Sequence, residues 1–150
     1  MAPFFAFLHH LAAFTVVAAL AIEFVLIRDA LTLEKARKLL RTDMVFGISA
    51  GVLLVVGLAR AFRFEKGATY YLHSWTFIAK FALFVIVGLL SIIPTIEFLS
   101  WRRAVNGGQL PDVSVQRLRS LRSIIHLELV GVVLIILCAA LMAKGVGLML

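Results

Sequence analysis

Four long apolar runs constrain what this chain can fold into. They are Phe4–Ile27, Met44–Ala61, Tyr70–Leu99 and Ile124–Leu141. Each run is long enough, or nearly so, to cross a bilayer core that requires about 20 apolar residues. Because a strand edge exposed to lipid would leave backbone groups unpaired, each run should form a helix. The mean hydropathy of +1.06 likewise indicates that the solvent of this chain is a lipid bilayer.

The order of these runs predicts a single transmembrane domain of 150 residues and the all-α class. We expect an integral membrane up-down-up-down four-helix bundle, because short connections make consecutive helices antiparallel neighbours. The predicted spans are 4–27, 44–61, 72–99 and 123–144. In such a bundle the first and third helices face each other across one diagonal, and the second and fourth across the other.

The distribution of basic residues predicts the orientation in the membrane. Connections 28–43 and 101–122 each carry five Lys or Arg residues, whereas connection 60–74, which includes Lys66, carries three. By the positive-inside rule, the first and third connections face the cytoplasm, and the N and C termini lie outside. The net charge of +7 therefore reflects topology. No nucleic-acid partner is expected, because the Arg-rich segments lack interleaved aromatic residues.

Local patterns predict finer structure along the chain. Segment Leu31–Leu40 is amphipathic and is expected to lie on the membrane surface. Pro94 should kink the third helix, and Ser114 is a plausible N-cap for the fourth. Gly47 and Gly51 are spaced so that another helix can approach closely, either within the bundle or from a second copy in a homodimer.

Eight ionisable residues interrupt the apolar runs and are the candidates for function. A charged side chain in hydrocarbon costs roughly 2.5–3.5 kcal/mol, so each one that is kept needs a physical reason. They are His9, His10, Glu23, His73, Lys80, Glu97, His126 and Glu128. The lone Cys138 is typical of a small apolar packing residue and allows no intramolecular disulfide.

The outer half of the predicted bundle holds the first group of candidates. His9 or His10 would face His73 across the diagonal, and imidazoles that face each other in a bundle are suitable axial ligands for haem iron. Glu23 lies about 40° around the helix from His9 but about 140° from His10, so His9 is expected to point inward. Lys80, near the bilayer midplane, requires an anion such as a haem propionate or a substrate carboxylate.

The inner half holds the second group. Glu23, Glu97, His126 and Glu128 lie within about two turns of the cytoplasmic ends of their helices. They could bind a divalent metal, pass protons or pair with arginines at the same level, namely Arg28, Arg102, Arg103 and Arg122. Because His126 and Glu128 are about 200° apart on their helix, both cannot point to one site, and no metal ligand is assigned here.

Several motifs carry a resemblance to known families. In the first helix His9 is followed by Thr15, and in the third helix Trp75 is followed by Lys80. This layout resembles the HemJ-type protoporphyrinogen IX oxidases and the CopD-like membrane domains. The motifs of segment 91–103 resemble an uncharacterised family of small bacterial membrane proteins over nearly the whole chain. The segment departs from the HemJ type, which has a Tyr-His pair at this end of the helix.

The resemblance implies a haem b-binding redox protein of the bacterial inner membrane, which oxidises a porphyrinogen or exchanges electrons with quinone. In this hypothesis His9 and His73 are the axial ligands, and Lys80 anchors a propionate or a substrate carboxylate. The residues expected to assist are Arg60 and Arg63 at the mouth of the site and Glu23 as a proton relay.

Two other functions remain open. One is a non-enzymatic transport or assembly subunit for a metal or an anion, in which Lys80 and the carboxylates form an ion path. The other is a structural membrane partner whose buried charges fix the register of its helices. At the level of single residues, His9 and His73 can also be interfacial, and Lys80 can form a simple ion pair with Glu23.

Overall fold

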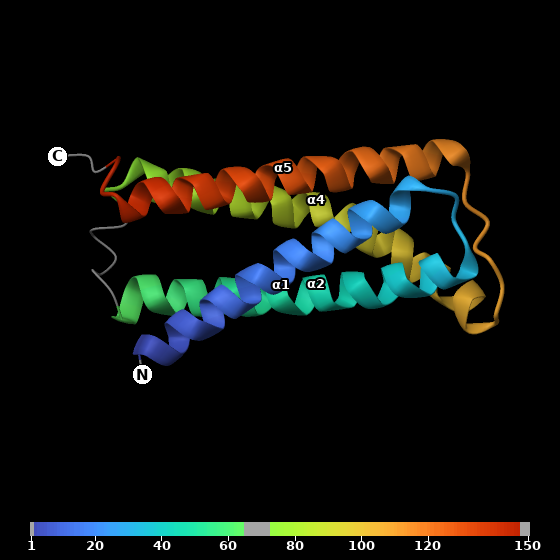
Figure 1. The fold of residues 1–150 in the computed structure, drawn as a ribbon, viewed down its shortest axis with the longest axis horizontal. Coiled ribbons are helices and arrows are strands. Elements are labelled where there is room, and N and C mark those ends of the chain that lie inside the picture. Colours follow the sequence, from blue (N-terminus) through green and yellow to red (C-terminus); the bar gives the residue numbers. More distant parts are fainter. Residues whose placement is uncertain (1, 65–72, 148–150) are drawn as a thin grey trace.

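The computed structural model describes residues 2–64 and 73–147, and within them the protein is all-α (Figure 1). The predicted span start at residue 72 and Lys66 lie outside the described residues. The elements are α1 (Ala2–Arg28), α2 (Leu33–Ala59), the π-helix η1 (Arg60–Phe64), α4 (Trp75–Asn106) and α5 (Val115–Ala143). Four of the described helices are long and apolar enough to cross a membrane, which confirms the predicted fold class.

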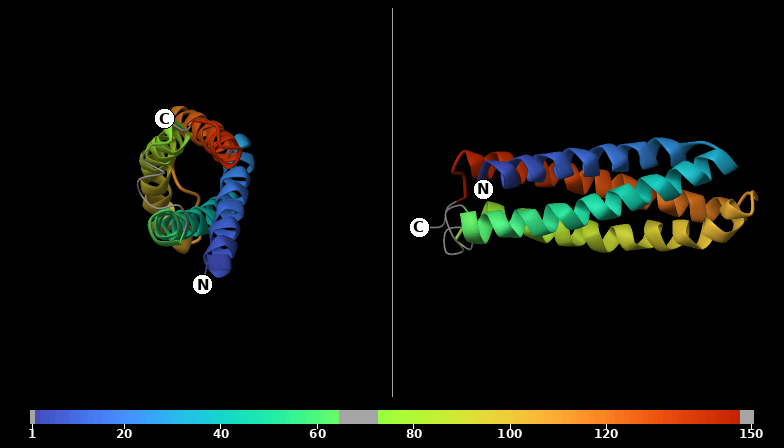
Figure 2. Two further views of the ribbon diagram at one scale, coloured as in Figure 1. Left: turned by 90° about the vertical axis from the view of Figure 1, so that its left-hand side faces the viewer. Right: turned by 90° about the horizontal axis from the view of Figure 1, so that it is seen from below.

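Two helical hairpins build the bundle. Helix α1 packs mainly against α2, and α4 packs mainly against α5, while α1–α5 and α2–α4 contacts join the two hairpins. Figure 2 shows this antiparallel arrangement from the end and from below. Helices α1 and α4 therefore lie on one diagonal, as the up-down-up-down order predicts.

The bundle has two chemically different ends. Helix α1 begins and α5 ends at one of them, called here the terminal end (Figure 1). Connections 29–32 and 107–114 lie at the opposite end, called here the basic end because most of the Lys and Arg residues surround it. The helices are 27 to 32 residues long. They therefore measure about 40–48 Å against a hydrocarbon core of about 30 Å, so their last turns reach headgroup level.

Helix α2 begins eleven residues before the predicted second span. Thr32 is its N-cap, and its side chain accepts a hydrogen bond from the backbone N–H of Lys35 at 3.2 Å. The prediction that Leu31–Leu40 lies on the membrane surface is wrong, because Ala36 and Leu39 are fully buried in the core. The apolar face of this stretch continues into the span instead of facing lipid headgroups.

The break between α4 and α5 agrees with the sequence analysis. Helix α4 ends at Asn106, and Gly108 adopts a positive φ of 72°, which favours glycine. The side chain of Ser114 accepts a hydrogen bond from the backbone N–H of Arg117 at 3.2 Å, so the predicted N-cap is confirmed. Helix α4 runs as one element through the buried Pro94.

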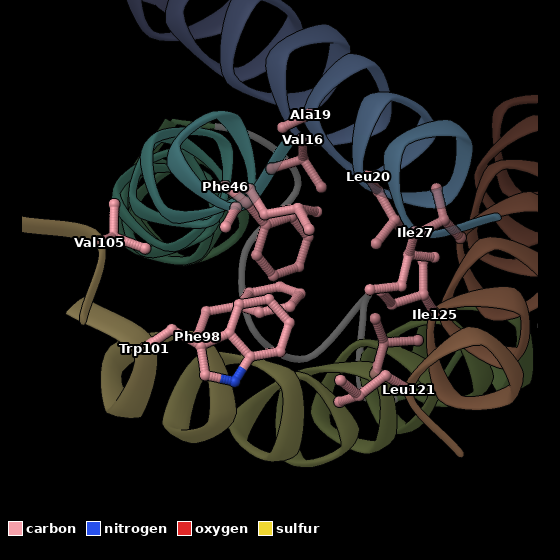
Figure 3. Close-up of a cluster of buried hydrophobic side chains, with 14 residues drawn as sticks. Val16, Ala19, Leu20, Ile27, Phe46, Phe98, Trp101, Val105, Leu121 and Ile125 are labelled. Carbon is pink, nitrogen blue, oxygen red and sulfur yellow. The ribbon is translucent and has the colours of Figure 1, made fainter. Parts of the chain in front are cut away.

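The apolar core is concentrated toward the basic end. Phe98 and Trp101 of α4 pack edge to face with ring centroids 5.1 Å apart. Figure 3 shows side chains from all four helices converging beside these rings, including Phe46, Ile27 and Ile125. This core fixes the two hairpins against each other.

Two glycines of α2, Gly47 and Gly51, do not pack within the bundle. Gly47 and Gly51 are exposed, and a Cβ added at either position would meet no atom within 4 Å. The prediction of close helix packing inside the bundle is therefore wrong for this pair. The face of α2 that carries Gly47 and Gly51 points outward, and the predicted homodimer stays a prediction.

Candidate functional site

Each of the four spanning helices contributes one polar residue to a group inside the bundle, in the half toward the basic end. We call it the acidic cluster, and its members are Glu23 of α1, Asp43 of α2, Thr95 of α4 and Glu128 of α5. Asp43, Thr95 and Glu128 lie ten to thirteen residues from the basic ends of their helices. That distance is about 15–20 Å along the helix axes, well inside a bilayer core.

The three carboxyl side chains are removed from solvent. Glu23 is 2% exposed, Asp43 6% and Glu128 1%. Glu23 interacts electrostatically with both Asp43 and Glu128, and Glu128 also interacts with Asp43. Three acidic groups from three helices therefore share one low-dielectric environment.

Among residues 2–64 and 73–147, only one of these carboxyls has a hydrogen-bond partner. The hydroxyl of Thr95 donates to Oδ1 of Asp43 at 2.8 Å, which joins α4 to α2. Among the described residues, Oε1 of Glu23 and Oε1 of Glu128 have no partner. Burying an unpaired polar group costs free energy. Such groups are therefore retained mainly where they serve a function.

The electrostatics of the acidic cluster require a positive charge inside it. Three neighbouring carboxylates cannot all be ionised in a low-dielectric site, because like charges repel and burial penalises each of them. Either protons or a bound cation must neutralise them. Within residues 2–64 and 73–147, no group of His, Cys, Asp and Glu has an arrangement suited to a metal ion.

Local sequence explains how two of these residues reach the cluster. In α2 the buried residues Ala36, Leu39, Asp43 and Phe46 recur at helical spacing, so Asp43 shares the inward face of its helix. In α4, Thr95 directly follows the buried Pro94, which has no backbone N–H to donate.

Two members of the predicted inner group lie elsewhere. Oε2 of Glu97 accepts a hydrogen bond from Nε of Arg117 at 2.8 Å, and its Oε1 accepts one from the Trp101 ring at 3.2 Å. The predicted arginine pairing is thus correct for Glu97, although the partner differs from those expected. His126 is exposed, with its ring 5.7 Å from that of Phe24. Glu97 and His126 therefore lie outside the acidic cluster, in line with the prediction that His126 and Glu128 cannot point to one site.

The predicted ion pair between Lys80 and Glu23 does not form. Lys80 lies in the second turn of α4, at the terminal end, and its Nζ is 5.5 Å from the centroid of the Phe77 ring. Glu23 lies five residues from the opposite end of α1. On α4, Lys80 lies fifteen residues, or about 22 Å, from Thr95, the residue of that helix which belongs to the same cluster as Glu23.

The predicted haem ligands lie near the terminal end. The half-buried His9 ring packs on α2, where a Cβ added at Gly57 would lie 3.3 Å from its Cε1 atom. His10 is exposed, and its Nδ1 atom hydrogen-bonds to the carbonyl of Ala6 at 2.6 Å. His73 is exposed in the turn before α4. The structure therefore places His9 against its hairpin neighbour, and agrees that His9 is more buried than His10.

The two arginines expected at the mouth of that site are at the end of α2. Arg60 is half-buried and opens the π-helix η1, and Arg63 is exposed in the same element. A π-helical turn inside a helix often accompanies a functional site, but it also occurs where a helix ends.

Sequence analysis missed Asp43 and Thr95. Asp43 was placed in the connection because it borders the apolar run that starts at Met44. The signal that could have found it is its helical spacing from Ala36 and Leu39. Thr95 is not ionisable, and only its position after Pro94 distinguishes it.

The comparisons with known proteins agree with the membrane fold. The profile of a family described as "Predicted membrane protein (DUF2214)" matches residues 2–147. No curated protein and no solved structure gives a significant match. The expected place in a membrane-protein family of unknown function is confirmed, and the likeness to the HemJ and CopD-like groups stays a prediction.

Proposed function

We propose that this chain, which belongs to the DUF2214 family of predicted membrane proteins, is a transport protein whose acidic cluster carries protons through the membrane. One observation carries the proposal. Glu23 and Glu128 are almost completely buried, each with an unpaired Oε1 atom among the described residues, and they interact electrostatically with each other.

Protons suit the acidic cluster better than the other ions considered. An anion would be repelled by three carboxyl groups. A divalent metal needs several ligand atoms arranged around one point, and the described residues offer no such group. A proton needs only one oxygen at a time, and it converts a costly buried carboxylate into a neutral acid.

The position of the cluster supports a transport role. The Thr95–Asp43 hydrogen bond joins α4 to α2, and Glu23 of α1 lies within electrostatic range of Glu128 of α5. Both links cross from one hairpin to the other, where packing is less extensive than inside each hairpin. Loss of a proton from a carboxyl group therefore adds repulsion between the hairpins and its gain removes that repulsion, and a small relative movement would expose the cluster to one side and then the other.

Proton flux into liposomes tests the proposal. The purified protein is reconstituted with a pH-sensitive dye inside, and a potassium diffusion potential drives proton entry. We expect the wild-type protein to acidify the lumen faster than empty liposomes do. The variants Glu23→Gln and Glu128→Gln keep the side-chain shape and remove the titrating oxygen, so they should lower the rate at least about tenfold, as loss of a proton-transfer group does.

Glu97→Gln is the matched control, because Glu97 is paired with Arg117 outside the acidic cluster. It should leave the proton flux unchanged. Infrared difference spectra between acidic and alkaline buffer provide an independent measurement, since a protonated carboxyl has its own carbonyl band. Two results together would rule out the proton-carrying role. They are a proton flux equal to that of empty liposomes, and an infrared spectrum of Glu128→Gln that keeps every protonated-carboxyl band of the wild-type protein.

The haem b hypothesis is a separate proposal, supported by the half-buried imidazole of His9 on α1. If haem b is held there, His9 is the ligand that the bundle itself encloses, and an exposed His73 would have to turn inward. A reduced-minus-oxidised visible spectrum of the purified protein tests this, with His9→Ala as the ligand variant. A wild-type spectrum without a haem band after expression with adequate haem would exclude it, and with it the porphyrinogen or quinone chemistry.

A further inference from the structure

A second feature of the molecule lies at the basic end, apart from the acidic cluster. A cavity of about 350 Å³ opens between the two connections and the start of α5. Its apolar lining includes Leu31 from connection 29–32, Leu110 and Pro111 from connection 107–114, and Leu118 from α5. Arg119 and Arg122 also border it. The cavity thus combines an apolar floor with two guanidinium groups.

The two arginines differ in what they already bind. Nε of Arg122 donates to the backbone carbonyl of Ile27 at 2.6 Å, so this side chain holds the end of α1 to α5. The exposed guanidinium of Arg119, in the part of the chain that the structure describes, has no acidic or carbonyl partner. A charge-assisted acceptor for Arg119 is therefore missing from the described chain.

The location of the cavity restricts what can fill it. Some of the residues that line the cavity follow the end of α1, and the others precede α5 or lie in its first turns. The cavity therefore lies where the spans leave the hydrocarbon core. Lipid molecules are the ligands present at that level in high concentration. The segments 28–43 and 101–122, which include the helix ends around the cavity, carry ten Lys and Arg residues, and this favours an anionic headgroup over a zwitterionic one.

We propose that this cavity binds an anionic phospholipid. The phosphate accepts hydrogen bonds from Arg119, and the first methylene groups of an acyl chain lie against Leu31, Leu110 and Leu118. Arginine suits this role because its planar guanidinium can donate two hydrogen bonds to one phosphate. The lipid would hold connections 29–32 and 107–114 together at the basic end, where the chain itself provides the Arg122–Ile27 hydrogen bond.

Native mass spectrometry of the full-length protein in detergent tests the proposal. The protein is titrated with phosphatidylglycerol and, separately, with phosphatidylcholine of the same acyl chains. We expect tighter binding of phosphatidylglycerol to the wild-type protein. Arg119→Ala should weaken that binding about tenfold, because one charge-assisted hydrogen bond is lost. Leu118→Trp should weaken it as well by filling the apolar part of the cavity while keeping every charge.

Arg37→Ala is the matched control, since Arg37 is also exposed near the basic end but does not border the cavity. It should bind phosphatidylglycerol as the wild-type protein does. An equal loss of phosphatidylglycerol binding in Arg37→Ala and Arg119→Ala would mean that the lipid is attracted only by the overall positive charge of the basic end. That result would overturn the proposed site. Displacement of the lipid by water-soluble glycerol phosphate at equal concentration would identify a free phosphate ester as the ligand and overturn the lipid assignment.

Discussion

At the scale of single residues, Gly131 is the position where α5 lies directly against α4. A Cβ added there would overlap the side chain of Val87. We therefore expect Gly131→Ala to lower the free energy of unfolding by about 1–3 kcal/mol, as overpacking does in a close-packed interior. The measurement is the thermal unfolding of the purified protein in detergent.

Two further variants separate this steric effect from a general effect of alanine. Val87→Ala in the Gly131→Ala background should recover most of the lost stability, because the two side chains act on the same contact. Gly88→Ala should not destabilise, since a Cβ there meets no atom within 4 Å and alanine is the better helix former. Independent, additive losses at positions 87 and 131 would contradict the packing.

Residue identity alone predicted half of the acidic cluster. Glu23 and Glu128 could be found because each interrupts an apolar run, where any charge is costly. Asp43 borders its run, so hydropathy assigned it to solvent, and Thr95 carries no charge at all. Which carboxyls meet depends on the rotation of four helices about their axes, and a single sequence does not specify those rotations.

At the scale of elements, helix existence was predictable and helix boundaries were not. All four spans were recognised because lipid leaves few alternatives to a helix. Helix α2 begins at Leu33, eleven residues before the predicted second span, and the charged residues between Glu34 and Arg41 lower the mean hydropathy of these first turns. Those charges lie on the outer side of the helix, while Ala36 and Leu39 are buried, so periodicity was the better guide than average hydropathy.

At the scale of the whole molecule, the hairpin architecture explains why the predicted inner and outer groups of residues differ in how their side chains are brought together. The two hairpins pack together through the core shown in Figure 3, toward the basic end, and there the acidic groups of different helices can meet. Near the terminal end, His9 packs on Gly57 of its own hairpin. Diagonal placement of α1 and α4 was correctly predicted, yet it does not by itself bring side chains from those helices into contact.

The orientation of the bundle in the membrane is the prediction that belongs to the whole molecule. The positive-inside rule places the basic end in the cytoplasm, since segments 28–43 and 101–122 each carry five Lys or Arg residues and segment 60–74 carries three. Single cysteines test this after the half-buried Cys138 is replaced by alanine. Val146 and Gln109 are both exposed, one at each end of the bundle. A membrane-impermeant maleimide should label Val146→Cys in intact cells, but Gln109→Cys only after permeabilisation. The reverse pattern would show that the basic end faces outward, and any proton path through the acidic cluster would then open near the outer surface.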